Sequence, residues 1–405
     1  MNNKFWLINA LVETGFEYEK NNIIGTKTEK RNILIENGKI VDITINQPLD
    51  TEYPIKDAKE LLILPSLKEN HIHLDKGHFG GKWKAATPFV SVFNRIEEEK
   101  GFLKDFLDTT TEKAEALLSL ITGFGVTNTR VQCNIDPVIG LGNMERVKEA
   151  LDNYSSKLDY ELVAFPQHGL LKSDSISLMK DAMRNGVNVV GGLDPATIDN
   201  NIESSLGKMM DIAVEFDSDI DIHIHDRGTL GMYTIKRLAS FIEDAKWFNR
   251  VTISHGYCLG DLTSSEVLDL CDIFKELGIS ISTTCPIDTA CPPIPLLYEN
   301  GVKVNIINDN INDHWSPFGT GDLLQKASTM AEKFGWIDEY SLTRALSFIT
   351  GGKTPLNSSG ECVWPKVGDE ASMIFVNSSC SAEAVARISK RSAVMFKGNI
   401  VSGNL

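Results

Sequence analysis

The sequence predicts an α/β protein that combines a (β/α)8 TIM barrel with a small β-sandwich domain built from both chain ends. Between about Leu61 and Thr350, short apolar segments alternate with amphipathic helical segments, as in repeated βα units around a parallel sheet. Strand and hairpin patterns occupy the two ends of the chain. We therefore expect one composite β-sandwich domain from residues 1–60 and 352–405, and a barrel domain from residues 61–351.

Eight segments of the middle region have the length and composition of buried strands. Eight parallel strands with helices between them close most economically as a barrel. An open doubly wound sheet is the alternative, but no glycine-rich phosphate loop follows the first predicted strand. The eight segments are Leu61–Leu64, Gly125–Val131, Tyr160–Phe165, Val187–Gly191, Ile220–Ile224, Arg250–Ser254, Ser280–Thr284 and Val302–Ile307.

Hairpins are predicted in both terminal regions. Asn37-Gly38 separates the apolar segments Asn32–Glu36 and Ile40–Ile43, and Asn-Gly between such segments is the strongest short hairpin signal. Near the other end, a turn at Lys397–Asn399 follows the strand pattern of Ala393–Phe396. Because the two ends have the same character, we expect them to share one small sheet domain.

The composition is that of a soluble globular protein with a sizeable core, because 42% of the residues are hydrophobic and 23% are charged. A formal charge of −15, without any run of Lys or Arg, argues against nucleic acid and anionic membranes as partners. Phe5–Val12 is apolar but lacks a basic lead and a small-residue cleavage site, so we interpret it as an edge strand. We expect a cytoplasmic homo-oligomer that binds a small molecule.

The seven cysteines are odd in number and scattered, without the pairwise C-x-x-C spacing of a structural zinc site or a redox motif. Reduced thiols are therefore expected. Cys285 and Cys291 are the closest pair, and we interpret them as two thiols in a loop that Pro292 and Pro293 follow.

Four of the eight histidines lie in two His-x-His pairs. His71 and His73 follow the first predicted barrel strand, and His223 and His225 lie at the end of the fifth. Residues i and i+2 of a strand point to the same face, so each pair places two imidazoles on one side of the sheet. This arrangement can supply half of a metal site.

Two further strand ends carry residues of the same kind. His255 ends the sixth predicted strand, and Asp309 follows the eighth. Either residue alone is more often a hydrogen-bonded structural group, but four strand ends together lie on the face where barrel enzymes act. Imidazole and carboxylate ligands suit zinc or ferrous iron, and a catalytic site keeps one position open for water. The pattern predicts a catalytic metal site.

The same segments resemble the cytosine deaminase branch of the amidohydrolase superfamily over nearly the whole chain. The resemblance is carried by Leu64-Pro65, His71–Lys76, Val163–Gln167, the second His-x-His pair, Ser254-His255 and Asp309. Within this branch, three longer strings are most similar to the triazine-ring hydrolases of the N-isopropylammelide isopropylamidohydrolase type. These strings are Val190–Thr197, Asp221–Asp226 and Trp315–Asp322.

The resemblance implies one divalent metal ion per chain, Zn2+ or Fe2+. The implied ligands are His71, His73, His223 and Asp309. The resemblance also implies His255 as a proton-handling or oxyanion-stabilising residue and Gln167 as a contact to the ring amide. We further expect Asp309, Asp226 and His225 to take part in catalysis and Trp315 to contact the substrate. In this scheme the metal lowers the pKa of water, Asp309 takes its proton, and Gln167 meets the ring amide.

Two positions depart from the deaminase pattern. Asp226 stands where a glutamate is usual, one methylene shorter, and Gln132 stands where relatives have a histidine. We therefore expect His225 or His255 to handle the proton, with Asp226 orienting a neighbouring imidazole. Lys76, on the loop after the first motif, is expected to be solvated or to line the substrate entrance.

The predicted function is hydrolysis of a carbon–nitrogen bond of a small nitrogen heterocycle, by deamination as in cytosine deaminase. Removal of an alkylamine from an aminotriazine-type ring and hydrolysis of a cyclic amide remain alternatives, because all three reactions share water activation. The fourth predicted strand ends in Gly191–Asp194, without a lysine that could bridge two ions, so a single metal is expected. A non-catalytic barrel that binds proteins is the alternative of a different class.

Overall fold

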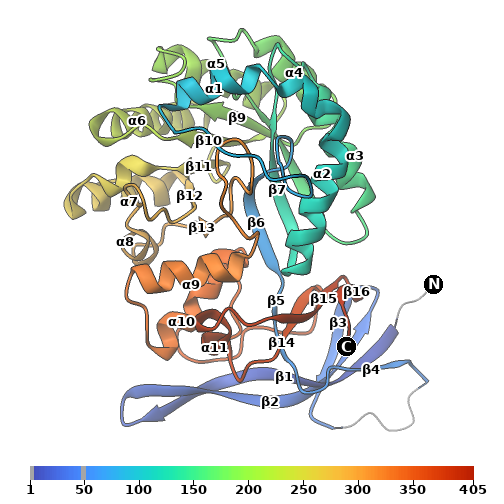
Figure 1. Cartoon of the computed structure of the whole chain (residues 1–405). Helices are drawn as coiled ribbons and strands as arrows, with labels where there is room; N and C mark the ends of the chain where they lie inside the picture. The colour runs from blue at the N-terminus through green and yellow to red at the C-terminus, as the bar shows by residue number, and fades with distance from the viewer. Residues whose placement is uncertain (1–3, 47–51) are drawn as a thin grey trace.

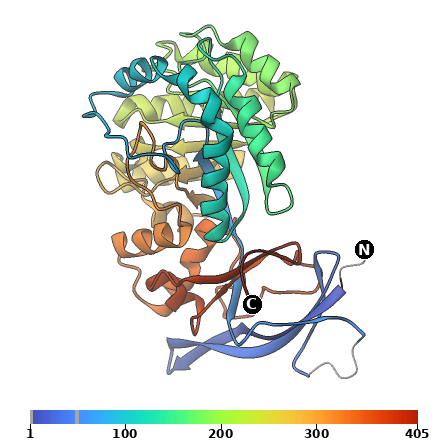
Figure 2. The same cartoon turned by 45° about the vertical axis from the view of Figure 1, so that its right-hand side comes forward.

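The structure is a computed structural model that describes residues 4–46 and 52–405. It contains a parallel barrel and, beside the N-terminal end of the first barrel strand, a second sheet formed by both ends of the chain (Figures 1 and 2). The predicted (β/α)8 architecture is confirmed, and the open doubly wound alternative is excluded.

The barrel sheet holds eight strands that pair in chain order, and every pairing is parallel. Both faces of this sheet are covered, so both carry apolar side chains, and the sequences of these strands are therefore nearly continuously apolar. The strands are β6 (Leu67–His73), β7 (Val126–Asn134), β8 (Asp159–Phe165), β9 (Val189–Leu193), β10 (Asp219–Ile224), β11 (Val251–His255), β12 (Ser280–Thr283) and β13 (Val304–Ile306).

Helices follow the strands and cover the outside of the barrel (Figure 1). A capping box between Thr263 and Glu266 begins α7, and Gly278, with φ of +67°, ends it. No helix in the described part of the chain is both long and apolar enough to cross a membrane. The helices are α1 (Val92–Lys100), α2 (Leu103–Gly123), α3 (Gly142–Asn153), α4 (Ile176–Arg184), α5 (Ile202–Glu215), α6 (Gly228–Ala245), α7 (Ser264–Leu277), α8 (Ile294–Glu299), α9 (Leu323–Lys333) and α10 (Glu339–Ala345).

The barrel closes between β6 and the residues that follow β13. Ile72 forms a parallel bridge with Asp309. The Asp309 amide donates to the His71 carbonyl at 3.0 Å, and the His73 amide donates to the Asp309 carbonyl at 3.3 Å. The backbones of three predicted metal ligands therefore form the seam where the barrel closes. These residues are His71, His73 and Asp309.

The second sheet has the strand order β16-β15-β14-β5-β1-β2-β3, with β4 paired to β1. The two predicted hairpins are confirmed, because Glu36 pairs with Lys39 and Phe396 pairs with Asn399. One helix, α11 (Ser381–Ala386), follows β14. The strands are β1 (Lys4–Glu19), β2 (Asn22–Glu36), β3 (Lys39–Thr44), β4 (Ile55–Asp57), β5 (Leu62–Pro65), β14 (Met373–Val376), β15 (Arg391–Phe396) and β16 (Asn399–Gly403).

Two strand predictions are wrong. Leu61–Leu64 is not the first barrel strand; β5 pairs with β1 and β14 in the second sheet, and β6 opens the barrel. Leu62 and Leu64 pack into the barrel core while Ile63 packs into the second core, so this strand is buried on both faces like a barrel strand. Phe5–Val12 is also not an edge strand, because β1 pairs on both sides.

Glu13 of β1 is a buried carboxyl group between the second sheet and α11. It accepts a hydrogen bond from the Ser381 amide, but its other oxygen has no partner in the described residues. Burial raises the pKa of Glu13 to about 7, and the Ser381 hydrogen bond only partly opposes this. The folded protein therefore holds a proton that the unfolded chain releases at lower pH.

We predict that Glu13→Gln stabilises the protein relative to wild type as the pH rises from about 4.5 to about 7, by up to about 3 kcal/mol. Above the unfolded pKa, the wild-type free energy of unfolding falls because the unfolded state binds fewer protons. Tm measured across this range checks the prediction, with the exposed Glu19→Gln as control. Parallel Tm curves for Glu13→Gln and wild type would contradict it.

Candidate active site

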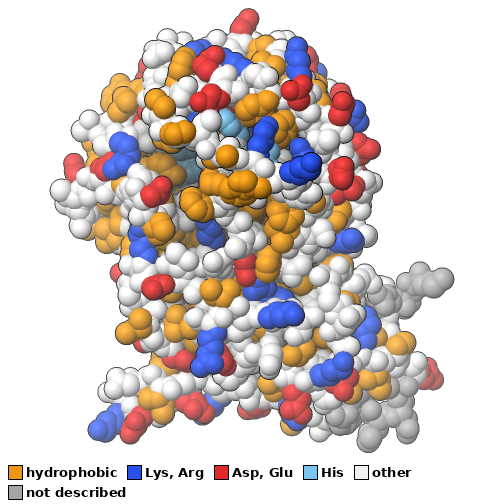
Figure 3. Space-filling model, in the orientation of Figure 1, with side chains coloured by type: hydrophobic (Ala, Val, Ile, Leu, Met, Phe, Trp, Pro, Cys, Tyr) orange, Lys and Arg blue, Asp and Glu red, His pale blue; other side chains and the backbone are white. Residues whose placement is uncertain are grey.

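The sequence-predicted residues gather at the C-terminal ends of the barrel strands, where side chains from different strands meet. Figure 3 shows histidine atoms at the bottom of a hollow on this face, with hydrophobic and basic side chains around it. His71 and His73 come from β6, His223 from β10 and His255 from β11, while Asp309 follows β13. The strand-end interpretation of these residues therefore agrees with the fold.

Two groups of these side chains have the spacing of metal ligands: His71 with His73 and His223, and His71 with His255 and Asp309. Asp309 Oδ1 lies 3.4 Å from His71 Nε2 and 3.4 Å from His73 Nε2. One nitrogen of each of His71, His73 and His223 lies within 4.8 Å of the others. Two ligand atoms about 2.0–2.1 Å from a tetrahedral zinc ion are about 3.3–3.4 Å apart, so the carboxylate distances match one edge of such a site.

The ligand atoms also lack other partners. In the described residues, His71 Nε2, both ring nitrogens of His223, and Asp309 Oδ1 are buried without a hydrogen bond. His73 Nδ1 is likewise buried without one. An unpaired buried polar atom is costly, and several that converge on one point are typical of a site that could hold a cation. The donor set therefore fits a divalent cation that prefers nitrogen and oxygen ligands.

Hydrogen bonds behind His71 orient its ring. Ser254 Oγ donates to Asp221 Oδ1 at 2.6 Å and lies 2.9 Å from His71 Nδ1. Because the hydroxyl proton goes to Asp221, the Nδ1–H of His71 can donate to Ser254 and leave Nε2 free for a metal. Burial would lower the pKa of His71, but Asp221 and Asp309 raise it to about 9. A bound cation would take the place of that extra proton.

His225 and His255 form a second group beside the ligands. Their rings stack with centroids 4.3 Å apart. Asp194, at the end of β9, accepts from the His225 amide at 2.6 Å and lies 2.7 Å from its Nδ1. Burial would lower the pKa of His225, but the Asp194 carboxylate raises it. His255 is buried, and this burial, reinforced by His225, lowers its pKa well below the usual value.

The orienting role expected of Asp226 belongs to Asp194. Asp226 Oδ1 accepts a hydrogen bond from the Thr197 hydroxyl, whereas both hydrogen bonds to His225 come from Asp194. Sequence reasoning missed Asp194 because it lies on a different strand and no local spacing links it to His225. Burial and the nearby Asp194 raise the pKa of Asp226, and Asp226 Oδ2 has no partner among the described residues.

Three residues at these strand ends have a strained backbone conformation. Asp194, His255 and Asp309 have φ values of +34°, +71° and +63°. Residues other than glycine rarely adopt positive φ, and such residues cluster at functional sites, where the surrounding fold holds them.

A buried lysine lines the other side of the hollow. Lys76 is 1% exposed, contacts Gln167 Oε1 through its ammonium group and lies 3.6 Å from Glu99. The Trp315 indole also donates to Glu99. The expectation of a solvated Lys76 is wrong, because helix α1 supplies a carboxylate partner that lies far along the sequence. Gln167 and Trp315, the two expected substrate contacts, lie in this group.

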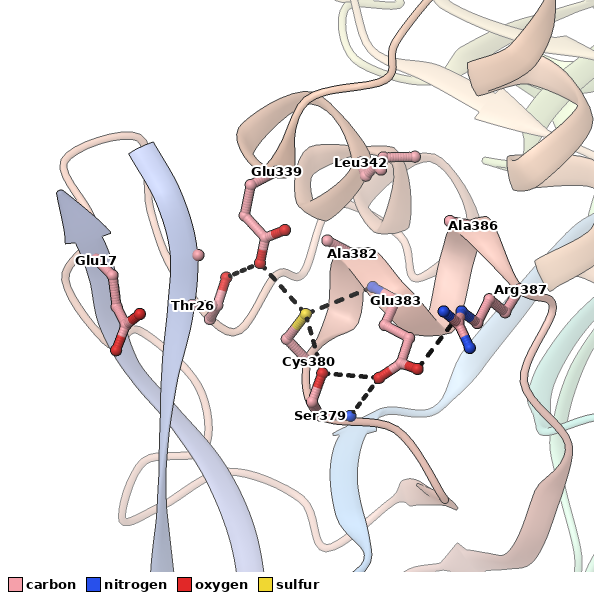
Figure 4. A pocket seen from close by; sticks show the side chains of 11 residues that line it. Glu17, Thr26, Glu339, Leu342, Ser379, Cys380, Ala382, Glu383, Ala386 and Arg387 are labelled. Atoms are coloured by element: carbon pink, nitrogen blue, oxygen red, sulfur yellow. Dashed lines mark hydrogen bonds and ion pairs between the residues drawn. The ribbon is translucent and has the colours of Figure 1, made fainter. Parts of the chain in front are cut away.

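A separate cavity of about 470 Å3 lies between the β1–β2 hairpin and helices α10 and α11 (Figure 4). Its polar groups mostly satisfy one another. Glu339 accepts from Thr26 at 2.6 Å and from Cys380 at 3.2 Å, and Glu383 accepts from Ser379. The converging unpaired atoms described above belong to the barrel end and not to this cavity.

Known proteins resemble this chain over most of its length. It is 40% identical over 405 residues to the uncharacterized protein YahJ of Escherichia coli, and the match covers 99% of this chain and 88% of YahJ. It is 30% identical over 352 residues to N-isopropylammelide isopropyl amidohydrolase of Pseudomonas sp. strain ADP, covering 85% of this chain and 87% of that enzyme.

Solved structures give the same picture. N-isopropylammelide isopropylaminohydrolase from Burkholderia multivorans superposes with a TM-score of 0.87 and 27% identity, covering 99% of both chains. A 5-methylcytosine deaminase from Klebsiella pneumoniae has the same fold, with a TM-score of 0.80, 22% identity, and coverage of 99% of this chain and 98% of that chain. The model of the amidohydrolase family matches residues 107–402. The chain belongs to the amidohydrolase family and is a hydrolase that acts on carbon–nitrogen bonds.

Proposed function

We propose that the protein is a mononuclear metal-dependent hydrolase that removes an exocyclic amino group from a small nitrogen heterocycle. The observation that carries the proposal is the set of buried, unpaired ligand atoms of His71, His223 and Asp309, with His73 Nε2 3.4 Å from Asp309, beside the stacked His225 and His255. The first group fits a metal, and the second can handle the protons of a departing amine. A protein-binding scaffold would have no need of either.

One Zn2+ or Fe2+ ion would be held by these four ligands. When bound, such an ion supplies Lewis acidity, which lowers the pKa of water toward neutrality. The single-ion proposal also draws on β9, which ends in Leu193 and carries no lysine to bridge a second ion. Asp309, His71 and His73 remain together without the ion because the barrel seam holds their backbones.

Asp309 is positioned to accept the proton of the attacking water. Burial would raise the pKa of Asp309, but His71 and His73 keep it well below the usual value, so the carboxylate stays ionised. An ionised carboxylate next to the water site is suited to act as general base. Asp309 Oδ1 faces the ligand histidines, so the second oxygen remains for the proton.

His225 is suited to protonate the leaving amine. Its Nδ1 is engaged by Asp194, and its side chain is 24% exposed, so Nε2 can face the hollow. Because Asp194 raises the pKa of His225, the imidazole retains a proton closer to neutral pH than an ordinary buried histidine. His255, which is buried and neutral, can hydrogen-bond to the oxygen that develops at the attacked carbon.

Gln167 and Lys76 together offer both donors and acceptors to a substrate ring. A lactam or amidine edge presents alternating donors and acceptors, which an amide side chain can complement. Lys76 adds a desolvated positive charge that favours a ring oxygen with partial negative charge. Phe165, whose ring stacks on His223 with centroids 4.1 Å apart, and Trp315 supply the apolar walls.

The identity of the leaving amine has two candidates. Deamination is our first choice, and the deaminase of the same fold supports it. Release of a small alkylamine is the second candidate, because the enzyme named N-isopropylammelide isopropyl amidohydrolase is 30% identical over 85% of this chain. Both reactions break the bond between a ring carbon and an exocyclic nitrogen, so the same residues serve either one.

We predict about one tightly bound zinc or iron ion per chain. Elemental analysis of protein purified without added metal measures this stoichiometry directly. His223→Ala should hold metal more weakly because one of the ligands is lost, whereas Gln167→Ala should keep full occupancy. Two ions per chain, or none together with activity that chelators do not affect, would overturn the single-ion proposal.

A substrate screen with separate assays for ammonia and amine release identifies the reaction. The panel should contain pyrimidines, pterins, aminotriazines and creatinine-like rings. On the best substrate, Asp309→Asn should lower kcat at least about 10²-fold, because an amide cannot accept the proton. Near-normal kcat in this variant would place the base elsewhere, and ring opening without amine release would identify cyclic amide hydrolysis.

Asp194→Asn should lower kcat/KM and move the limb of the pH profile that reports protonated His225 to lower pH. The reason is that the amide no longer stabilises the imidazolium, so the pKa of His225 falls. Asp226→Asn is the matched comparison, because it removes a neighbouring carboxylate that does not bond to His225. A shift of the profile in Asp226→Asn but not in Asp194→Asn would reverse the two roles.

A further inference from the structure

Cys285 and Cys291 face each other in the loop between β12 and α8. Their Sγ atoms lie 3.9 Å apart, and no disulfide joins them. Cys285 is buried, whereas Cys291 is half-buried and therefore within reach of a small reagent. A disulfide needs the two sulfur atoms about 2.05 Å apart, so each side chain has only a short way to move.

We infer that Cys285 and Cys291 form a redox-sensitive dithiol, which a low-molecular-weight disulfide converts to an intramolecular disulfide that lowers turnover. The bond itself is independent of the proposed function, and only the loss of turnover rests on it. The amidohydrolase reaction has no use for these thiols, because neither belongs to the metal or proton-handling groups described above.

The oxidation balances as two thiol–disulfide exchanges. The Cys291 thiolate attacks one sulfur of the external disulfide, and its partner sulfur leaves as a thiolate. Cys285 then loses its proton and attacks Cys291 Sγ, which forms the internal bond and releases the second external thiol. The Cys285 hydrogen bond lowers the pKa of Cys291, and the nearby Lys333 adds to this, which favours Cys291 as the first nucleophile.

The dithiol loop is connected to the proton-handling histidines. The side chain of Thr284, next to Cys285, lies beside the Tyr257 hydroxyl and opposes the rise in the Tyr257 pKa that burial causes. The Tyr257 ring has its centroid 5.4 Å from that of His255 and 5.8 Å from that of His225. Drawing Cys285 toward Cys291 therefore displaces Thr284, which lies beside the aromatic neighbour of both histidines.

Two further contacts join the loop to the active-site segments. A Cβ at Gly260, just after Tyr257, would meet the Cys291 carbonyl oxygen at 2.5 Å, so the two backbones are in close contact. Thr289, between the cysteines, accepts a hydrogen bond of 2.7 Å from Arg227, the residue after Asp226. The loop cannot change shape without moving its neighbours on the catalytic face, because packed interiors transmit displacement.

Exposure to glutathione disulfide tests whether the bond forms. In wild type, we expect two fewer titratable thiols after denaturation, the loss of two hydrogen atoms from the intact mass, and a peptide with Cys285 linked to Cys291. Cys291→Ser should lose this product, whereas Cys362→Ser, which changes another half-buried cysteine that bonds to the Trp364 carbonyl, should keep it. A stable mixed disulfide on Cys291 alone would overturn the inference.

Activity on a substrate from the screen tests the consequence. Oxidised wild type should lose about tenfold to 10²-fold in kcat/KM, since small displacements of catalytic groups have effects of this size. Dithiothreitol should restore activity, and Cys291→Ser should be unaffected by the oxidant while keeping its initial activity. A cross-linked protein with unchanged kcat/KM would refute the effect on turnover, and a wild type without turnover before oxidation would instead refute the proposed function.

Discussion

The backbone hydrogen bonds between β6 and Asp309 are the interaction on which the rest of the structure depends. They close the barrel, and by the same two bonds they place His71, His73 and Asp309 side by side. Glu69, buried behind the seam, accepts from the His71 amide at 3.1 Å and from the Asn308 side chain at 2.8 Å, which holds the two sides together. The proposed ligands are therefore pre-organised by barrel closure itself, so a metal ion would not have to assemble them.

Electrostatics divides the site into two halves with different tasks. On the side of His71 and Asp309, carboxylate and imidazole atoms converge without partners, which is unfavourable unless a cation is present. On the side of His225, Asp194 supplies a partner within the protein, which raises the pKa of this imidazole and provides a counter-charge when it is protonated. Metal binding should consequently stabilise the fold as well as the reaction, because the cost of the unpaired atoms is removed on binding.

Much of this organisation could be predicted from sequence, because it rests on local periodicity. Alternating βα units predicted the barrel, and the period-2 spacing of His71 and His73 predicted a shared face. The wrong predictions concern residues whose burial or partner is set by contacts with distant parts of the sequence. The all-apolar strand β5 resembles a barrel strand because it is buried between two cores, and Lys76 is buried only because Glu99 of α1 folds over it. Asp194 reaches His225 from a neighbouring strand, and only the parallel register of β9 and β10 brings them together.

A single metal ion held at the junction of β6 and Asp309 is the feature that the proposed function requires. The most direct measurement is an anomalous difference map from crystals of protein carrying its native metal, recorded at the zinc and iron absorption edges. We predict one strong peak per chain, bounded by His71 Nε2, His73 Nε2, His223 and Asp309 Oδ1. Two peaks in the barrel, or a peak that lies away from Asp309, would contradict a single ion held at the seam of the barrel.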